Sequence, residues 1–139
     1  MASASASLEL SIPAHDVWQL IGGFLSLPDW VPFITESTAS DGGRVRHLRT
    51  ADGGAVVERL EHYDNAARTY SYSITEGPFP VTDYLATLKV EALTTGTTRI
   101  TWGGQFVPAG VTVAESETLF QGVYEGGLAA LQAHYSAKG

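Results

Sequence analysis

The chain contains no cysteine and only eight basic residues among 139. Without thiols, a disulfide scaffold, a zinc–thiolate site and cysteine redox chemistry are all excluded. Fifteen acidic residues give a formal net charge of −7, and no two basic residues are adjacent. Proteins that bind nucleic acids or anionic membrane surfaces need clustered Lys and Arg. We therefore expect no nucleic-acid partner and no attraction to an anionic membrane.

Long apolar runs are also missing, and none approaches the ~20 residues of a membrane-spanning helix. Residues 1–7 lack the basic start and the apolar core of a secretion signal, so we expect a flexible lead-in and a cytoplasmic protein. A chain of this length fits a single domain over residues 1–139 that buries roughly 65–70% of its surface without needing a metal. We expect a monomer or a homodimer.

Turn signals and apolar spacing divide the chain into a short α-helical part, a β part and a long helix. A strand at residues 8–12 precedes Pro13, which suits the first turn of a helix, and residues 27–32 allow one further helical turn. Recurring Asp-Gly and Gly-Gly turns then separate six β runs, which predicts an antiparallel meander. These runs are 34–40, 44–51, 55–63, 68–76, 82–93 and 97–107.

After Gly110 the apolar period changes from two to three and four. Phe120, Tyr124, Leu128 and Leu131 form the stripe of an amphipathic helix over about residues 113–137. Such a helix must bury its stripe, and the aromatic face of the sheet is the available partner. The sequence therefore predicts an α+β domain.

Residues 84–106 form the best-defined hairpin. A turn at residues 94–96 pairs apolar positions of the two strands: Val90 with Ile100, Leu88 with Trp102, Ala86 with Gly104, and Tyr84 with Phe106. The small pair Ala86 and Gly104 leaves either a close contact with the helix or an empty space. Gly126-Gly127 weakens the helix by about 1 kcal/mol per residue, which favours a close approach to the sheet near Gly104 or Ala86.

This order of elements, together with several short segments, resembles the SRPBCC superfamily (START-like, birch-pollen-allergen-like), most closely its bacterial polyketide cyclase/dehydrase and lipid-transport branch. The resemblance implies a helix-grip fold. In that fold a curved antiparallel sheet of about seven strands wraps around a long C-terminal helix, with two short helices after strand 1 and a ligand cavity between sheet and helix. The matching segments are residues 12–14, 17–18, 27–30, 45–48, 57–60, 70–72, 80–84 and 126–131.

Two charged residues are expected on the inner face of the sheet. Turns at 64–67 and 52–54 pair Leu60 with Tyr72 and His62 with Tyr70, and place Arg46 near Leu60 on the same face as Glu58. A loop one residue different would turn Arg46 outward. Buried charges are costly unless they are paired. The pair therefore either orients a ligand, with Glu58 as a possible general acid or base, or is structural or exposed.

The other candidate ligand contacts are mostly aromatic. Trp30 and Phe33 are expected to form one lip of the cavity, Phe79 the opposite lip, and His62 a rim or surface position. The histidines show no metal-ligand spacing, and no cofactor motif occurs, so we expect neither a metal nor a cofactor. The remaining candidates are Leu60, Tyr70, Tyr72, Tyr84, Trp102, Phe106, Phe120 and Tyr124.

Three hypotheses for function remain open. The first is binding of a small hydrophobic or aromatic molecule, polyketide-like or lipid-like, in an internal cavity. The second is a cyclase or aromatase that uses the same cavity, because cyclisation needs mainly shape and one acid–base group. The third is an interaction domain whose cavity is filled by its own side chains.

Overall fold

The computed structural model describes residues 2–138 and confirms the predicted α+β helix-grip arrangement. Strand β1 (Ala2–Leu10) is followed by helix α1 (Ala14–Ile21) and the 3-10 turn η1 (Leu27–Asp29). The meander and the long helix follow. These are β2 (Ile34–Ser40), the 3-10 turn η2 (Asp41–Gly43), β3 (Val45–Thr50), β4 (Ala55–Asp64), β5 (Thr69–Glu76), β6 (Val81–Ala92), β7 (Thr98–Pro108) and α2 (Val113–Lys138).

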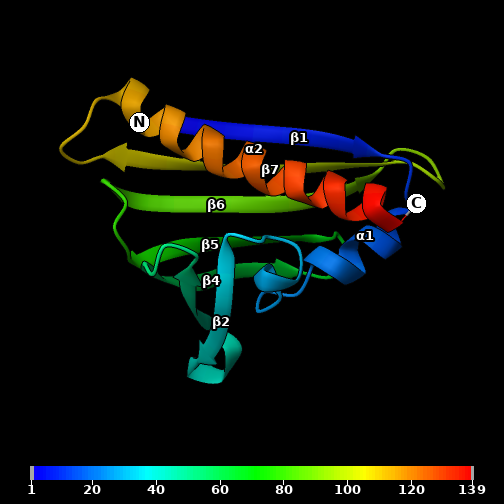
Figure 1. Ribbon diagram of the computed structural model, residues 1–139, viewed down its shortest axis with the longest axis horizontal. Coiled ribbons are helices and arrows are strands. Elements are labelled where there is room, and N and C mark those ends of the chain that lie inside the picture. Colours follow the sequence, from blue (N-terminus) through cyan, green and yellow to red (C-terminus); the bar gives the residue numbers. More distant parts are fainter. Residues whose placement is uncertain (1, 139) are drawn as a thin grey trace.

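The strands form one antiparallel sheet in the order β1-β7-β6-β5-β4-β3-β2. Figure 1 shows α2 lying along β1 and β7, with α1 beside the C-terminal end of α2. The segment from η1 to β2 lies toward the β2 edge of the sheet and reaches α2 where Phe33 lies beside Gly126. The long helix therefore covers one side of the inner face and leaves the side formed by β3, β4 and β5 to be covered by shorter segments.

The prediction of a flexible lead-in is wrong for residues 2–7. These residues form most of β1 and pair with β7, with Ala2 opposite Phe106. The helix also holds this edge strand, because Gln121 accepts from the Ser5 N–H and donates to the Ser5 carbonyl. Alternating Ala and Ser place only small side chains under α2. Because such residues give a weak apolar pattern, the sequence did not predict a strand here. Met1 lies outside the described residues.

The register of the β6–β7 hairpin is confirmed for three of its four predicted pairs, including Ala86 opposite Gly104. The fourth pair is wrong, because the register shifts between Thr82 and Leu85, where Asp83 adopts a φ of 51°. Both aromatic side chains of that pair still point inward, and the rings of Tyr84 and Phe106 stack with centroids 6.0 Å apart.

In the strands before this hairpin, the buried side chains point to the predicted face of the sheet, but the pairing between neighbouring strands differs from the prediction in two places. Leu60 pairs with Tyr72 as predicted, but an irregularity after Leu60 brings Tyr63 rather than His62 opposite Tyr70, and His62 is exposed. Arg46 lies opposite Glu58 instead of Leu60. Since this shift is an even number of residues, Arg46 still points inward, and it is completely buried.

Candidate functional site

A cavity of about 350 Å³ lies between the inner face of the sheet, α2 and the segment from η1 to β2. Six of the predicted ligand contacts line it, all but one of them aromatic: Phe33, Glu58, Tyr72, Tyr84, Trp102 and Phe120. Its aliphatic wall comes from residues that the sequence analysis did not select: Leu27, Val31, Ile34, Leu48, Val56 and Ile74. The wall is therefore largely apolar, and the carboxylate of Glu58 and the hydroxyls of Tyr72 and Tyr84 are the polar groups that the inner face of the sheet contributes to it.

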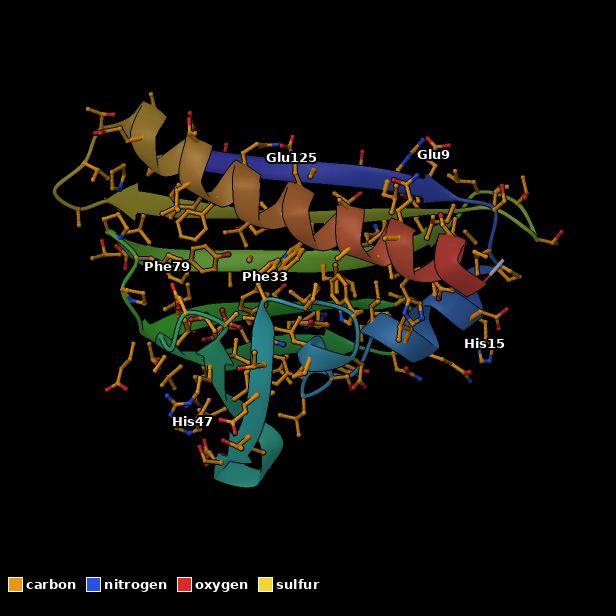
Figure 2. All side chains as sticks on the ribbon, viewed as in Figure 1. Glu9, His15, Phe33, His47, Phe79 and Glu125 are labelled. Atoms are coloured by element: carbon orange, nitrogen blue, oxygen red, sulfur yellow. The ribbon has the colours of Figure 1, made fainter. Side chains whose placement is uncertain are left out.

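The two aromatic residues predicted as opposite lips of the cavity, Phe33 and Phe79, both line it and lie in loops. Figure 2 shows Phe33 beneath α2 at the start of β2, and Phe79 at the end of the sheet where β5 joins β6. Phe79 packs against Phe120 of α2 with ring centroids 5.2 Å apart. Phe33 is 36% exposed and lies beside Gly126, where an added Cβ would sit 3.9 Å from its ring.

Arg46 and Glu58 form a buried ion pair next to the cavity. The Arg46 Nε donates to Glu58 Oε1 at 2.8 Å, and Nη2 lies 2.6 Å from the same oxygen as an ion-pair contact without hydrogen-bond geometry. Nη1 donates to the Phe24 carbonyl at 2.6 Å. The guanidinium carbon also lies 4.1 Å from the Phe24 ring centroid and 4.7 Å from that of Tyr72. Pairing, hydrogen bonds and aromatic faces together offset the desolvation of this cation.

The geometry of this pair leaves one carboxylate oxygen free. Both contacts from Arg46 reach Oε1 of Glu58, and no hydrogen bond within the described residues involves Oε2. Glu58 lines the cavity, whereas Arg46 does not. Burial raises the pKa of the Glu58 carboxyl, and the charge of Arg46 opposes that rise. Arg46 is thus a positioning residue that fixes Glu58 at the cavity wall.

Three phenols and an indole near the cavity form two further hydrogen bonds on the inner face. The hydroxyls of Tyr84 and Tyr124 are 2.5 Å apart, and the Trp102 Nε1–H donates to the Tyr72 hydroxyl at 2.9 Å. Burial raises the pKa values of Tyr72, Tyr84 and Tyr124, so the phenols stay neutral at physiological pH. Tyr72 accepts from Trp102, and within the described residues its own hydroxyl hydrogen has no acceptor.

Six predicted contacts do not line the cavity but support its wall. Trp30 packs against Trp102 with centroids 5.6 Å apart, Phe106 lies behind Phe120 at 4.7 Å, and Tyr70 lies edge-on to Phe24 at 5.7 Å. All of them are buried or partly buried, so predicting the inward face was not enough to predict contact with the cavity. The six are Trp30, Arg46, Leu60, Tyr70, Phe106 and Tyr124.

The turn between β3 and β4 adds a second carboxylate, that of Asp52, which is not among the ligand contacts predicted from the sequence. Thr50, Ala51 and Asp52 line the cavity, and Asp52 is exposed. Asp52 Oδ1 accepts hydrogen bonds from the Thr50 hydroxyl and from the Gly54 N–H, the latter at 3.0 Å. These bonds lower the pKa of the Asp52 carboxyl. Its position could not be predicted from strand alternation, because it lies in a turn.

Within residues 2–138, no group of His, Asp and Glu side chains could hold a metal ion. No helix in that part of the chain is long and apolar enough to cross a membrane.

Comparisons with known proteins agree with this architecture. XoxI from Bacillus cereus is 47% identical, with a TM-score of 0.94 over 96% of this chain and 95% of that one. An uncharacterised protein from Bacillus thuringiensis is 45% identical, with the same TM-score over 96% and 98% of the two chains. The Zhui aromatase/cyclase from a Streptomyces species has a TM-score of 0.74 over 94% and 89% at 19% identity, which shows a shared fold only.

A comparison with curated proteins gives no match. The model of one family, described as polyketide cyclase / dehydrase and lipid transport, matches residues 1–136. The match spans the sheet, both helices and all the residues that line the cavity. The chain therefore belongs to the polyketide cyclase / dehydrase and lipid transport family.

Proposed function

We propose that this protein binds a small hydrophobic or aromatic molecule in the cavity between the sheet and α2. The observation that carries the proposal is a largely apolar cavity of about 350 Å³ in which a buried arginine fixes the carboxylate of Glu58 at the wall. Ligand pockets typically combine an apolar lining with a few placed polar groups, and they start at about 300 Å³. An engineered apolar cavity of about 150 Å³ already holds benzene, so a compound with two fused rings has room here.

The same volume argues against an interaction domain with a filled cavity. Side chains that filled the interior would leave voids little larger than a water molecule. Here the large aromatic residues stand around the space, with Phe120 and Trp102 on its wall.

Binding is tested with 2-naphthol as the probe, by isothermal titration calorimetry and by the shift in melting temperature. We expect saturable binding and a stabilised fold in the wild type. Ile74→Phe extends a wall residue into the cavity and should abolish binding while the protein stays folded. Thr75→Leu, an enlarged side chain on the exposed face of the same strand, is the matched control and should bind normally. Absence of binding in the wild type, or equal binding by Ile74→Phe, would contradict the proposal.

A second candidate is cyclase-type catalysis, and the free Oε2 of Glu58 is what favours it. A carboxylate whose pKa is raised by burial is better matched to moving protons near neutral pH than an exposed one. The aromatase/cyclase with the same fold makes a ring-forming substrate a reasonable class. If the protein is an enzyme, Glu58→Gln should lose turnover while retaining affinity for the substrate. If Glu58→Gln turns over a poly-β-carbonyl substrate at the wild-type rate, Glu58 is not the catalytic group.

A further inference from the structure

The cavity contains carboxylates but no cation. Among the described residues that line it, none is Lys, Arg or His, whereas Glu58 lies on the wall and Asp52 in the β3–β4 turn. The charged groups on the wall itself are therefore both acidic. The following inference rests on the proposed function and specifies which molecules the same cavity accepts.

Arg46 does not supply the missing positive charge to a ligand. It is 0% exposed and absent from the cavity wall. Its Nε and Nη1 donate to Glu58 and to the Phe24 carbonyl, and the Phe24 and Tyr72 rings lie against its guanidinium group. A ligand in the cavity thus faces Glu58 rather than the cation behind it. Even if the Arg46–Glu58 pair is counted as neutral, Asp52 leaves one net negative charge at the site.

The polar groups on the wall also favour one type of hydrogen-bonding partner. Among the described residues, the Oε2 atom of Glu58 has no donor, and the Tyr72 hydroxyl accepts from Trp102 but has no acceptor for its own hydrogen. A hydroxyl group can donate to a carboxylate and accept from a phenol. A carboxylate ligand could accept from Tyr72, but it has no hydrogen for Glu58, and two carboxylates placed side by side repel each other.

We infer that the cavity selects uncharged aromatic ligands that carry a hydroxyl group and rejects carboxylates of similar shape, with Glu58 and Asp52 as the residues that determine this selectivity. Free fatty acids and aromatic acids, which carry a carboxylate at neutral pH, should therefore bind this site more weakly than neutral hydroxyl compounds of similar shape.

The test compares 2-naphthol with 2-naphthoate by isothermal titration calorimetry near neutral pH, where the first is uncharged and the second is an anion. Wild-type protein should bind the naphthol at least about tenfold more tightly, the ratio that corresponds to about 1.4 kcal/mol. The comparison needs no variant, so it holds even if a substitution at Glu58 impairs folding. Equal or tighter binding of naphthoate would overturn the inference.

Two variants, at Glu58 and Asp52, and one control variant test which residues determine the selectivity. Glu58→Gln removes the charge and provides an amide that can donate, so the naphthol-to-naphthoate preference should fall toward one. Asp52→Asn should reduce it by a smaller factor, about twofold, because Asp52 is exposed to solvent. Glu61→Gln is the matched control, since Glu61 lies exposed on β4 and accepts from Ser73 on the outer face. An unchanged preference in folded Glu58→Gln and in Asp52→Asn, or a loss of preference in Glu61→Gln, would contradict the assignment.

The outcomes also separate this inference from the proposed function. If neither naphthol nor naphthoate binds, the binding function itself is wrong. If naphthoate alone binds, and Ile74→Phe abolishes its binding, the cavity is a ligand site but the inferred selectivity is wrong.

Discussion

The inner face of the sheet has a packed side and a hollow side, although both are rich in apolar and aromatic residues. On the packed side, α2 lies along β1 and β7, and Gly127 is so close to the Trp102 ring that a Cβ there would overlap it. A Cβ at Gly104 would likewise come within 2.5 Å of the Tyr124 hydroxyl. On the hollow side, Leu48, Val56 and Glu58 face the cavity.

This difference arises from small residues rather than from hydrophobicity. Glycine in both the helix and the sheet lets α2 approach β7 closely, and the small pair Ala86 and Gly104 accommodates the Tyr124 hydroxyl. The residues facing the hollow side have ordinary side chains, but α2 is held too far toward β1 to reach them. The position of the glycines therefore determines where the interior is filled and where a cavity remains.

The largest effect is expected from breaking the ion pair on the hollow side. Arg46→Leu leaves Glu58 buried without its counter-charge, which should lower the free energy of unfolding by about 3–5 kcal/mol. The measurement is urea denaturation at neutral pH. Arg49→Leu on the same strand is the control, because its ion pair with Glu36 is exposed and is worth about 0–1 kcal/mol. Equal losses in the two variants would show that the Arg46–Glu58 pair is not an essential part of the wall.

The second largest effect is expected where α2 approaches the sheet closely on the packed side. Gly127→Ala adds a methyl group against the Trp102 ring and should destabilise the protein by about 1–3 kcal/mol, even though Ala is the better helix former. Gly122→Ala in the same helix has open space around it and should stabilise by about 0.5–1 kcal/mol. If urea denaturation shows a lower free energy of unfolding for Gly127→Ala and a higher one for Gly122→Ala, the close contact between α2 and the sheet is confirmed. Stabilisation by both would mean that α2 can move away from the sheet at no cost.

The parts of the fold that could be predicted from the sequence are those with regular local structure. The fold, the strand order along the chain and the inward facing of Arg46 follow from turn residues and from the period of two, and an error of two residues in register does not change facing. The predicted pairs Tyr84 with Phe106 and His62 with Tyr70 are wrong because an irregularity inserts or shifts a residue, and the sequence carries no distinct signal for it.

It was harder to predict which inward-facing residues line the cavity and which lie behind its wall than to predict the fold. Leu48 and Val56 lie on the same inward faces as Arg46 and Glu58, so alternation alone could have selected them. Trp30 and Phe106, in contrast, are buried but covered by other aromatic rings, which depends on the three-dimensional packing of α2 and η1. Strand period gives the face of a residue, whereas contact with the cavity depends on what lies in front of that residue.

The smallest expected effect is a pH dependence that originates on the packed side. Burial raises the pKa of Tyr124 above its ordinary value near 10, so above pH 10 the unfolded chain loses this proton before the folded protein does. The folded state then holds more protons, and stability should be constant below pH 10 with respect to this group and fall above it, by about 1.4 kcal/mol per pH unit. Tyr124→Phe should remove that part of the slope in urea denaturation between pH 8 and pH 11. The values at pH 8 serve as the control, since loss of the bond to Tyr84 already changes stability there, where both phenols are neutral. An unaltered slope would mean that the Tyr124 phenol ionises as easily in the folded protein as in the unfolded chain, and that the packed side admits water.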